Sequence, residues 1–398
     1  MAEISGADGT AERGPTGDGG GGGSSSFSSS SPFPIAAPAD SPYPPAQAWA
    51  APPQQWADGH QWADGQQWVG GYGGGTVPKV VAAPAGSRYH EQARNGRQGW
   101  WHRLGELLVV VAMLTVGMVV VTGVGLVVAT ALGAEPAPDD GDVLIADPLV
   151  DTALGLLVLA IGIPVVMLAV RWCGSRPAGT LASVAGRVRW RWLGLCAAVA
   201  FPFMAVQMGV LMLWEWLAEG DSVFEGDAPE PGKLLLGLAL FVVLVPFQAG
   251  AEEFVFRGWL PQFFGGFLRS PWAGVAVASV LFALAHGFGG WSGFFLLLYS
   301  SLWWGWLVAR TGGLEAVIAM HTANNVFSFG LALAFGQLAD AGTAADAPWQ
   351  ALVVELVCAP VYCLVVARLA GARGLASVSG PDAVAVPAPV PAAGPGTV

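Results

Sequence analysis

Apolar runs long enough to cross a lipid bilayer recur along this 398-residue chain from about residue 107 onward. A helix needs about 20 such residues to cross the hydrocarbon layer. Because no water reaches that layer, the backbone polar groups of each run must bond within their own segment, as they do in a helix. The sequence therefore predicts an all-α, polytopic membrane protein with about eight transmembrane helices, at residues 107–133, 149–170, 192–217, 234–262, 272–288, 293–309, 314–336 and 350–369.

The first hundred residues have a different composition. Tracts such as "GGGGGSSSFSSSSPFP" offer too little apolar surface to offset the entropy lost on ordering. We expect residues 1–100 to form a disordered tail and residues 374–398 a flexible Ala/Pro/Val-rich tail. Inside the first tail a "QWADG" repeat places Trp56, Trp62 and Trp68 in register, and its role does not follow from the sequence.

Positive charge is distributed unevenly between the loops. Arginines precede the first span and fill the loop between the second and third spans, whereas "AEPAPDDGDVLIADP" and "EGDSVFEGDAPEPG" contain none. Arginine-rich loops stay on the cytoplasmic side of a membrane. We therefore expect a multi-pass protein of the cell membrane with both termini in the cytoplasm. The net charge of −11 gives no nucleic-acid-binding surface.

Two glutamates and an arginine interrupt the fourth apolar run, in "AEEFVFR" at residues 251–257. Charged side chains in lipid are costly and usually mark a functional site. Glu253 and Arg257 are four residues apart on one helical face, which predicts an ion pair. Glu252 is rotated by roughly 100° from Glu253 and has no such partner, so its carboxylate is free for another role.

Histidines and an amide in later apolar runs supply partners for that carboxylate. His286 follows "LFALA", and His321 and Asn325 are four residues apart in "MHTANN". A carboxylate, two imidazoles and an amide could hold one water, with Glu252 as the base and the other groups orienting the water or stabilising an oxyanion. This set predicts hydrolysis without a nucleophilic side chain.

In their order and spacing these motifs resemble a known family. "EEFVFR", "FALAH" and "HTANN" are similar to the EExxxR, FxxxH and HxxxN motifs of the CAAX prenyl endopeptidase and bacteriocin-processing (CPBP, Abi) intramembrane proteases. The resemblance implies a catalytic core at residues 234–336, with N-terminal transmembrane helices at 101–233 and a last helix at 337–373. It implies an endopeptidase that acts on a peptide or membrane-protein substrate.

The resemblance also implies roles for the residues. Glu252 would activate the water, His286 and His321 would polarise it, Asn325 would stabilise the oxyanion, and Glu253 and Arg257 would support the site. The family is often described as metalloproteases. Two imidazoles and a carboxylate are also a zinc ligand set, so zinc at Glu252, His286 and His321 stays open.

Two other functions compete with this one. "GWSGF" contains a GxSG pattern that would make Ser292 the nucleophile of a rhomboid-like serine protease, although that reading leaves Glu252 unused. A non-catalytic scaffold or immunity protein, or an ion-coupled transporter, would use the same acids and histidines to bind an ion or relay protons. Glu315 is expected to reach the membrane interface, whereas Glu355 and Asn324 have no assigned role.

Overall fold

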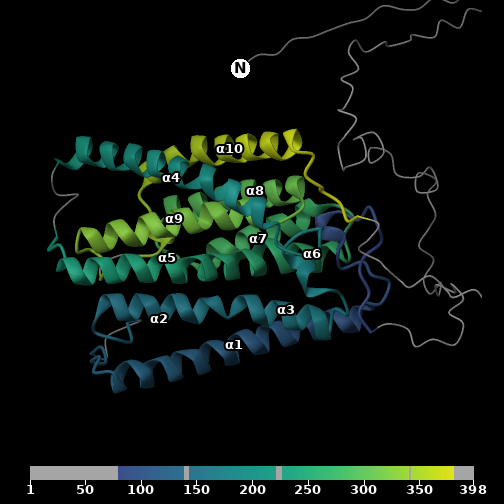
Figure 1. Ribbon diagram of the computed structural model, residues 1–398, viewed down its shortest axis with the longest axis horizontal. Helices are drawn as coiled ribbons and strands as arrows, with labels where there is room; N and C mark the ends of the chain where they lie inside the picture. The colour runs from purple at the N-terminus through teal and green to yellow at the C-terminus, as the bar shows by residue number, and fades with distance from the viewer. Residues whose placement is uncertain (1–78, 139–142, 221–225, 340–341, 381–398) are drawn as a thin grey trace, which may run out of the picture. The chain divides into compact units, whose positions relative to one another are not determined.

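The computed structural model describes residues 79–138, 143–220, 226–339 and 342–380 (Figure 1). The predicted tail up to residue 78, with its tryptophan repeat, and the chain from residue 381 lie outside this range. Among the described residues the only β-structure is three isolated bridges, which confirms the all-α prediction. The helices are α1 (Trp100–Ala131), α2 (Pro148–Ala160), α3 (Gly162–Trp172), α4 (Trp190–Glu219), α5 (Pro231–Glu253), α6 (Leu260–Gly265), α7 (Pro271–Ala285), α8 (Trp291–Thr311), α9 (Glu315–Ala334) and α10 (Trp349–Ala372).

Seven helical segments of the described chain are long and apolar enough to cross a membrane. One of them, Pro148–Trp172, consists of α2 and α3, and another, Pro231–Gly265, joins α5 to α6 through a π-helical segment. The fifth predicted span, at residues 272–288, is shorter than expected, because α7 has 15 residues and a length of about 22 Å. Gly287 adopts a left-handed backbone with φ of +87°, which ends this helix before residue 288.

Helix α9 lies between α4 and α5, and both pack along it (Figure 1). Helix α8 packs against α7 and α10, and α5 also contacts α2. Gly237 leaves room for a side chain of α9, because a Cβ at this position would lie 2.2 Å from a methyl carbon of Leu333. The packing of α5 along α9 brings their polar motifs to one helix interface.

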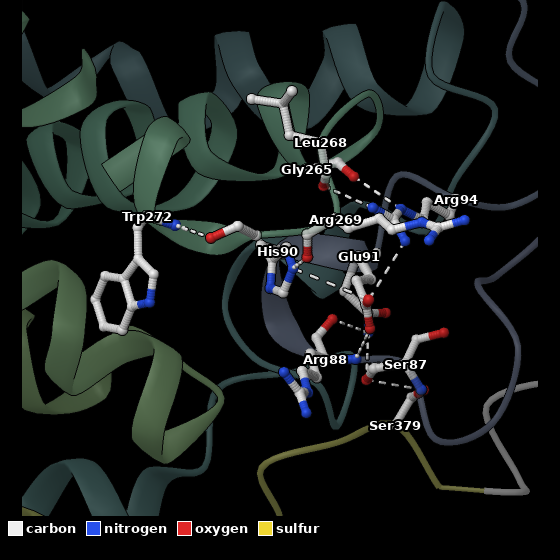
Figure 2. A network of polar contacts seen from close by, with 12 residues as sticks. Ser87, Arg88, His90, Glu91, Arg94, Gly265, Leu268, Arg269, Trp272 and Ser379 are labelled. Atoms are coloured by element: carbon white, nitrogen blue, oxygen red, sulfur yellow. Dashed lines mark hydrogen bonds and ion pairs between the residues drawn. The ribbon is translucent and has the colours of Figure 1, made fainter. Parts of the chain in front are cut away.

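Residues 79–99, which the sequence places in the N-terminal tail, pack against the turn that follows α6. Arg94 donates from Nε to the carbonyl of Gly265 at 2.8 Å and from Nη2 to that of Leu268 at 2.6 Å (Figure 2). His90 Nε2 lies 3.1 Å from the carbonyl oxygen of Arg269 (Figure 2). These carbonyls end α6 or follow it, where no helical donor reaches them. The composition of residues 79–99 could not reveal these contacts, because their partners lie in the turn after α6, far away in the sequence.

Residues 374–380, at the start of the predicted C-terminal tail, also contact the folded chain. Ser379 is buried, and its Oγ accepts a hydrogen bond from the Ser87 amide at 3.1 Å (Figure 2). The Ser379 amide donates to the Ser87 carbonyl at 2.9 Å. The two ends of the described chain therefore meet beside the turn between α6 and α7.

Glu315, which the sequence predicts to extend toward the membrane interface, is instead buried within the protein. It is 1% exposed at the start of α9. Arg189 donates to it twice, from Nε to Oε1 at 2.8 Å and from Nη2 to Oε2 at 2.7 Å. A guanidinium and a carboxylate paired in this way satisfy each other, which removes the reason to reach water.

Candidate active site

The two glutamates of "AEEFVFR" are the last residues of α5, and a π-helical segment, Phe254–Trp259, follows directly. A π-helix is wider than an α-helix and is frequently found at functional sites. Glu253 is fully buried, whereas the side chain of Glu252 is 13% exposed. Adjacent carboxylates thus point into different surroundings, as their rotation around the helix predicts.

The ion pair that the sequence spacing predicts is present inside the bundle. Arg257 Nη1 lies 3.1 Å from Glu253 Oε1, and both side chains are buried. The guanidinium carbon lies 3.8 Å from the ring centroid of Phe282 and 5.2 Å from that of Trp304. Aromatic faces attract a cation. Arg257 is therefore held by one carboxylate and by rings from α7 and α8.

His321 on α9 faces both glutamates. Its Nδ1 lies 2.7 Å from Glu253 Oε1, and its Nε2 lies 3.7 Å from Glu252 Oε2. The first distance is a hydrogen bond, and the second is too long for one. The imidazole also packs against Trp304, with ring centroids 5.4 Å apart. Glu253 thereby orients His321, and Nε2 is directed toward Glu252.

A chain of amides continues from Glu252 to the end of the HxxxN motif. Gln248 donates from Nε2 to Glu252 Oε1 at 2.5 Å and accepts at Oε1 from Asn325 Nδ2 at 2.9 Å. Asn325 Oδ1 in turn accepts from Asn324 Nδ2 at 3.0 Å. The second carboxylate oxygen, Glu252 Oε2, is buried and has no hydrogen-bond partner among the described residues.

His286 is the site residue that the structure does not bring into direct contact with this cluster. Its Nδ1 lies 2.9 Å from the carbonyl oxygen of Phe282, in its own helix. The ring of Phe282 lies 4.6 Å from that of His286 and 6.2 Å from that of His321. The two histidines are thus neighbours of the same phenylalanine, and the described contacts of His286 include none with Glu252.

The described residues do not form the zinc site that the sequence left open. They contain no group of three or more His, Cys, Asp and Glu side chains arranged to hold a metal ion. Glu252 Oε2 and His321 Nε2 lie 3.7 Å apart, whereas Nδ1 of His286 is bonded to the Phe282 carbonyl and the described contacts of His286 include neither of these residues. The donor set of Glu252, His286 and His321 therefore does not fit a metal as it stands.

Ser292 lies in the first turn of α8, and its hydroxyl donates to the carbonyl of Ala347 at 2.7 Å. A serine nucleophile needs a base within hydrogen-bond distance of its hydroxyl. Here the recorded partner is a backbone carbonyl that cannot accept the proton permanently. This geometry fits a packing role at the end of α8.

Glu355, which the sequence left without a partner, belongs to a second buried cluster. Its Oε2 accepts from Gln207 Nε2 at 2.7 Å, and its Oε1 accepts from the Ser300 hydroxyl at 2.6 Å. The three residues come from α10, α4 and α8. Both carboxyl oxygens of Glu355 therefore have neutral donors.

Sequence reasoning missed three residues of the candidate site: Gln248, Phe282 and Trp304. Gln248 carried a signal, because it is a polar residue in an apolar run and is four residues before Glu252. Phe282 is the phenylalanine of the FxxxH motif, although its contact with Arg257 could not be foreseen. Trp304 had no local signal, since "WWGW" is equally typical of an interfacial anchor.

Comparison with known proteins covers the same region. Residues 232–327 match the family described as type II CAAX prenyl endopeptidase Rce1-like, and this range contains the glutamates, both histidines and Asn325. The chain is also 29% identical over 198 residues to YyaK, an uncharacterized protein of Bacillus subtilis (strain 168). That alignment covers 48% of this chain and 64% of the relative. Comparison with solved structures gives no significant match.

Proposed function

Since residues 232–327 match the Rce1-like type II CAAX prenyl endopeptidase family, we propose that the protein is an intramembrane endopeptidase with a water activated by Glu252. One observation carries the proposal. Glu252 Oε2 is buried, has no hydrogen-bond partner among the described residues, and lies 3.7 Å from His321 Nε2. A carboxylate oxygen left in this way is ready to accept a proton from a water.

The distance between these two atoms suits a shared water. A water within hydrogen-bond reach, about 2.8 Å, of both Glu252 Oε2 and His321 Nε2 can donate one proton to each acceptor. The hydrogen bond from His321 Nδ1 to Glu253 keeps that proton on Nδ1 and leaves Nε2 as the acceptor. Glu253 and Arg257 thus act through His321, by holding its tautomer and orientation.

The reaction then needs two proton transfers and no covalent intermediate. Glu252 takes a proton from the water as the water oxygen attacks the peptide carbonyl carbon, and the carbonyl oxygen becomes an oxyanion. Asn325 Nδ2 uses one hydrogen for Gln248 and keeps a second for that oxyanion. Collapse of the intermediate breaks the C–N bond, and Glu252 returns the proton to the leaving amine.

His286 remains a proposed member of the site. Its Nδ1–H donates to the Phe282 carbonyl, so Nε2 is left as the acceptor. An imidazole held in this tautomer can orient a water or bind a substrate N–H. We assign it to the substrate side of Phe282. No step is assigned to a metal, because the described donor groups do not form a metal site.

We infer that both termini lie on the same side of the membrane, which we take to be the cytoplasm. The hydrogen bonds between Ser87 and Ser379 support a common side for the two ends, and they require an even number of crossings. Counting α7 as a short eighth crossing satisfies that condition. The arginines around these ends favour the cytoplasmic face.

The test uses purified protein in lipid vesicles and a peptide library in farnesylated and unmodified forms, with products identified by mass spectrometry. Wild type should cleave peptides, Glu252→Gln should not, and Ser292→Ala should cleave as wild type does. Glu252→Gln keeps the shape of the side chain and removes its basicity. Full cleavage by Glu252→Gln, or none by wild type, would overturn the proposal, and loss confined to Ser292→Ala would favour the serine mechanism.

A further inference from the structure

Gln248 is a buried amide with two charged or catalytic neighbours. It is 3% exposed, one turn before Glu252 on α5. Its amide nitrogen donates to Glu252 Oε1 at 2.5 Å, and its amide oxygen accepts from Asn325 Nδ2 at 2.9 Å. Gln248 therefore connects the proposed base with the proposed oxyanion donor.

The chemistry of the groups dictates the direction of this connection. An ionised carboxylate only accepts hydrogen bonds, so Gln248 must turn its NH₂ group toward Glu252. Its oxygen then faces Asn325, which must present its own NH₂ group. Asn325 Oδ1 is left to accept from Asn324. The charge on Glu252 thus orients three amides in sequence, and hydrogen bonds arranged in such a chain strengthen one another.

The same connection decides which carboxylate oxygen is available. Gln248 occupies Glu252 Oε1, whereas Oε2 is left facing His321 Nε2 at 3.7 Å. Pairs spaced by four residues lie on facing helices, 248 with 252 on α5 and 321 with 325 on α9. They are hydrogen-bonded at one end, from Asn325 to Gln248, and face each other at 3.7 Å at the other, between Glu252 and His321. Removing Gln248 would free the carboxylate to rotate and would release Asn325.

We propose that Gln248 is a positioning residue of the hydrolytic site, which holds the Glu252 carboxylate and the Asn325 amide in a common geometry. The inference rests on the proposed function and adds a residue outside the three motifs. It predicts that loss of Gln248 slows the chemical step and leaves substrate binding unchanged.

The test compares Gln248→Met with Gln207→Met. Gln207 is a matched control because it is also buried and also donates to a glutamate, Glu355, at 2.7 Å. For the fastest-cleaved peptide of the library, Gln248→Met should lower kcat by about 10-fold to 100-fold, because misplaced catalytic groups cost rates of that order. KM should stay within twofold. Gln207→Met should leave both constants unchanged per folded molecule.

A double-mutant cycle separates positioning from general packing. In the Asn325→Ala background the chain of amides is already broken, so Gln248→Met should cause a smaller further loss in kcat than it causes in wild type. Asn324→Ala removes the half-buried last amide of this series and should lower kcat by a few-fold. It is the alternative test if Gln248→Met does not fold. The inference is overturned if the effects of Gln248→Met and Asn325→Ala on kcat simply multiply. It is also overturned if Gln248→Met and Gln207→Met have equal kcat values.

Failure of the inference can be told apart from failure of the proposed function. If Glu252→Gln abolishes cleavage and Gln248→Met and Asn324→Ala do not change kcat, Gln248 has no positioning role and the glutamate mechanism stands. If Glu252→Gln cleaves fully, both proposals are wrong.

Discussion

Two clusters of buried polar side chains lie in the same apolar helix bundle, one around Glu252 and Glu253 and the other around Glu355. The two clusters differ in charge and in hydrogen bonding. At the candidate site, Glu253 pairs with Arg257 at 3.1 Å, and Glu252 keeps one buried oxygen without a hydrogen bond. In the second cluster both oxygens of Glu355 accept from neutral groups, and no salt bridge of Glu355 is found in the described part of the chain. Among the described residues, the first cluster contains a cation and an unpaired carboxylate oxygen, whereas in the second both carboxylate oxygens are paired and the unpaired acceptor is the amide oxygen of Gln207.

The difference separates a chemical site from a structural one. A buried polar group that stabilises a fold is expected to have all its hydrogen bonds made, as Glu355 has. An acceptor left unpaired costs free energy, and such a cost is typical of a group that must bind or react. Burial of an acid is therefore a weak guide to function in this protein, and an unpaired carboxylate oxygen that faces a second polar group, as Glu252 Oε2 faces His321 Nε2 at 3.7 Å, is a stronger one.

Exchange of each glutamate for glutamine should give the largest contrast between the clusters. Glu252→Gln should lower kcat by about 1,000-fold, the middle of the range for a lost general base. Glu355→Gln should leave kcat within twofold of wild type, because a neutral amide can keep contacts with Gln207 and Ser300. Both are measured on the same library peptide, per folded molecule. Similar losses of kcat in the two variants would show that the two clusters do not differ in their role in catalysis.

Substitution of Arg257 tests whether the cation found only in the first cluster contributes to stability. Arg257→Met should leave the Glu253 carboxylate buried without its cation and should lower the free energy of unfolding by at least about 3 kcal/mol. The measurement is denaturant unfolding in detergent micelles. Arg310→Met, at an exposed position near the end of α8, is the control and should change stability by about 0.5 kcal/mol or less. Normal stability of Arg257→Met would show that the ion pair is incidental.

The second cluster can be weakened without touching the first. Ser300→Ala removes the donor to Glu355 Oε1 and should cost about 1 to 2 kcal/mol of unfolding free energy, the penalty of one unmade buried hydrogen bond. Its kcat should equal that of wild type. A loss of activity at unchanged stability would instead connect the Glu355 cluster to the chemistry.

The smallest effect is expected for the pH dependence of stability that arises from His90, which belongs to a third polar network beside the turn between α6 and α7. Burial lowers the pKa of His90 from its ordinary 6.5, and this outweighs the opposite effects of the hydrogen bond to Arg269 and of Glu91. The unfolded chain therefore binds the proton more readily. Stability from neutral His90 is complete above about pH 6.5 and is lost as the pH falls through the lower folded pKa.

Thermal unfolding at pH 7.5 and pH 5.5 measures this effect. Wild type should lose about 2 °C more in Tm on acidification than His90→Gln, which cannot titrate. Equal changes in the two proteins would show that the His90 contacts in Figure 2 tolerate the charge.

Sequence spacing predicted the parts of the candidate site that lie within one helix. The pair of Glu253 and Arg257 follows from four-residue periodicity, and so does the common face of His321 and Asn325. The shortening of α7 was missed, because an apolar run does not show where a glycine will take a left-handed backbone. The ordered residues 79–99 were missed as well, because their partners are carbonyls of a turn about 170 residues away.

The sequence by itself determined the class of fold and the inventory of polar groups, because hydrophobic length and helical period act locally and do not depend on which helices become neighbours. Only the tertiary structure decided which groups meet. Asn325 reaches Gln248 across 77 residues, and His321 reaches Glu253 across 68. It also separated two glutamates of similar appearance in the sequence, Glu252 and Glu355, by leaving an acceptor unpaired on the first and by satisfying the second. The physical reason is that hydrogen-bond satisfaction in an apolar interior depends on the packing of helices from distant parts of the chain.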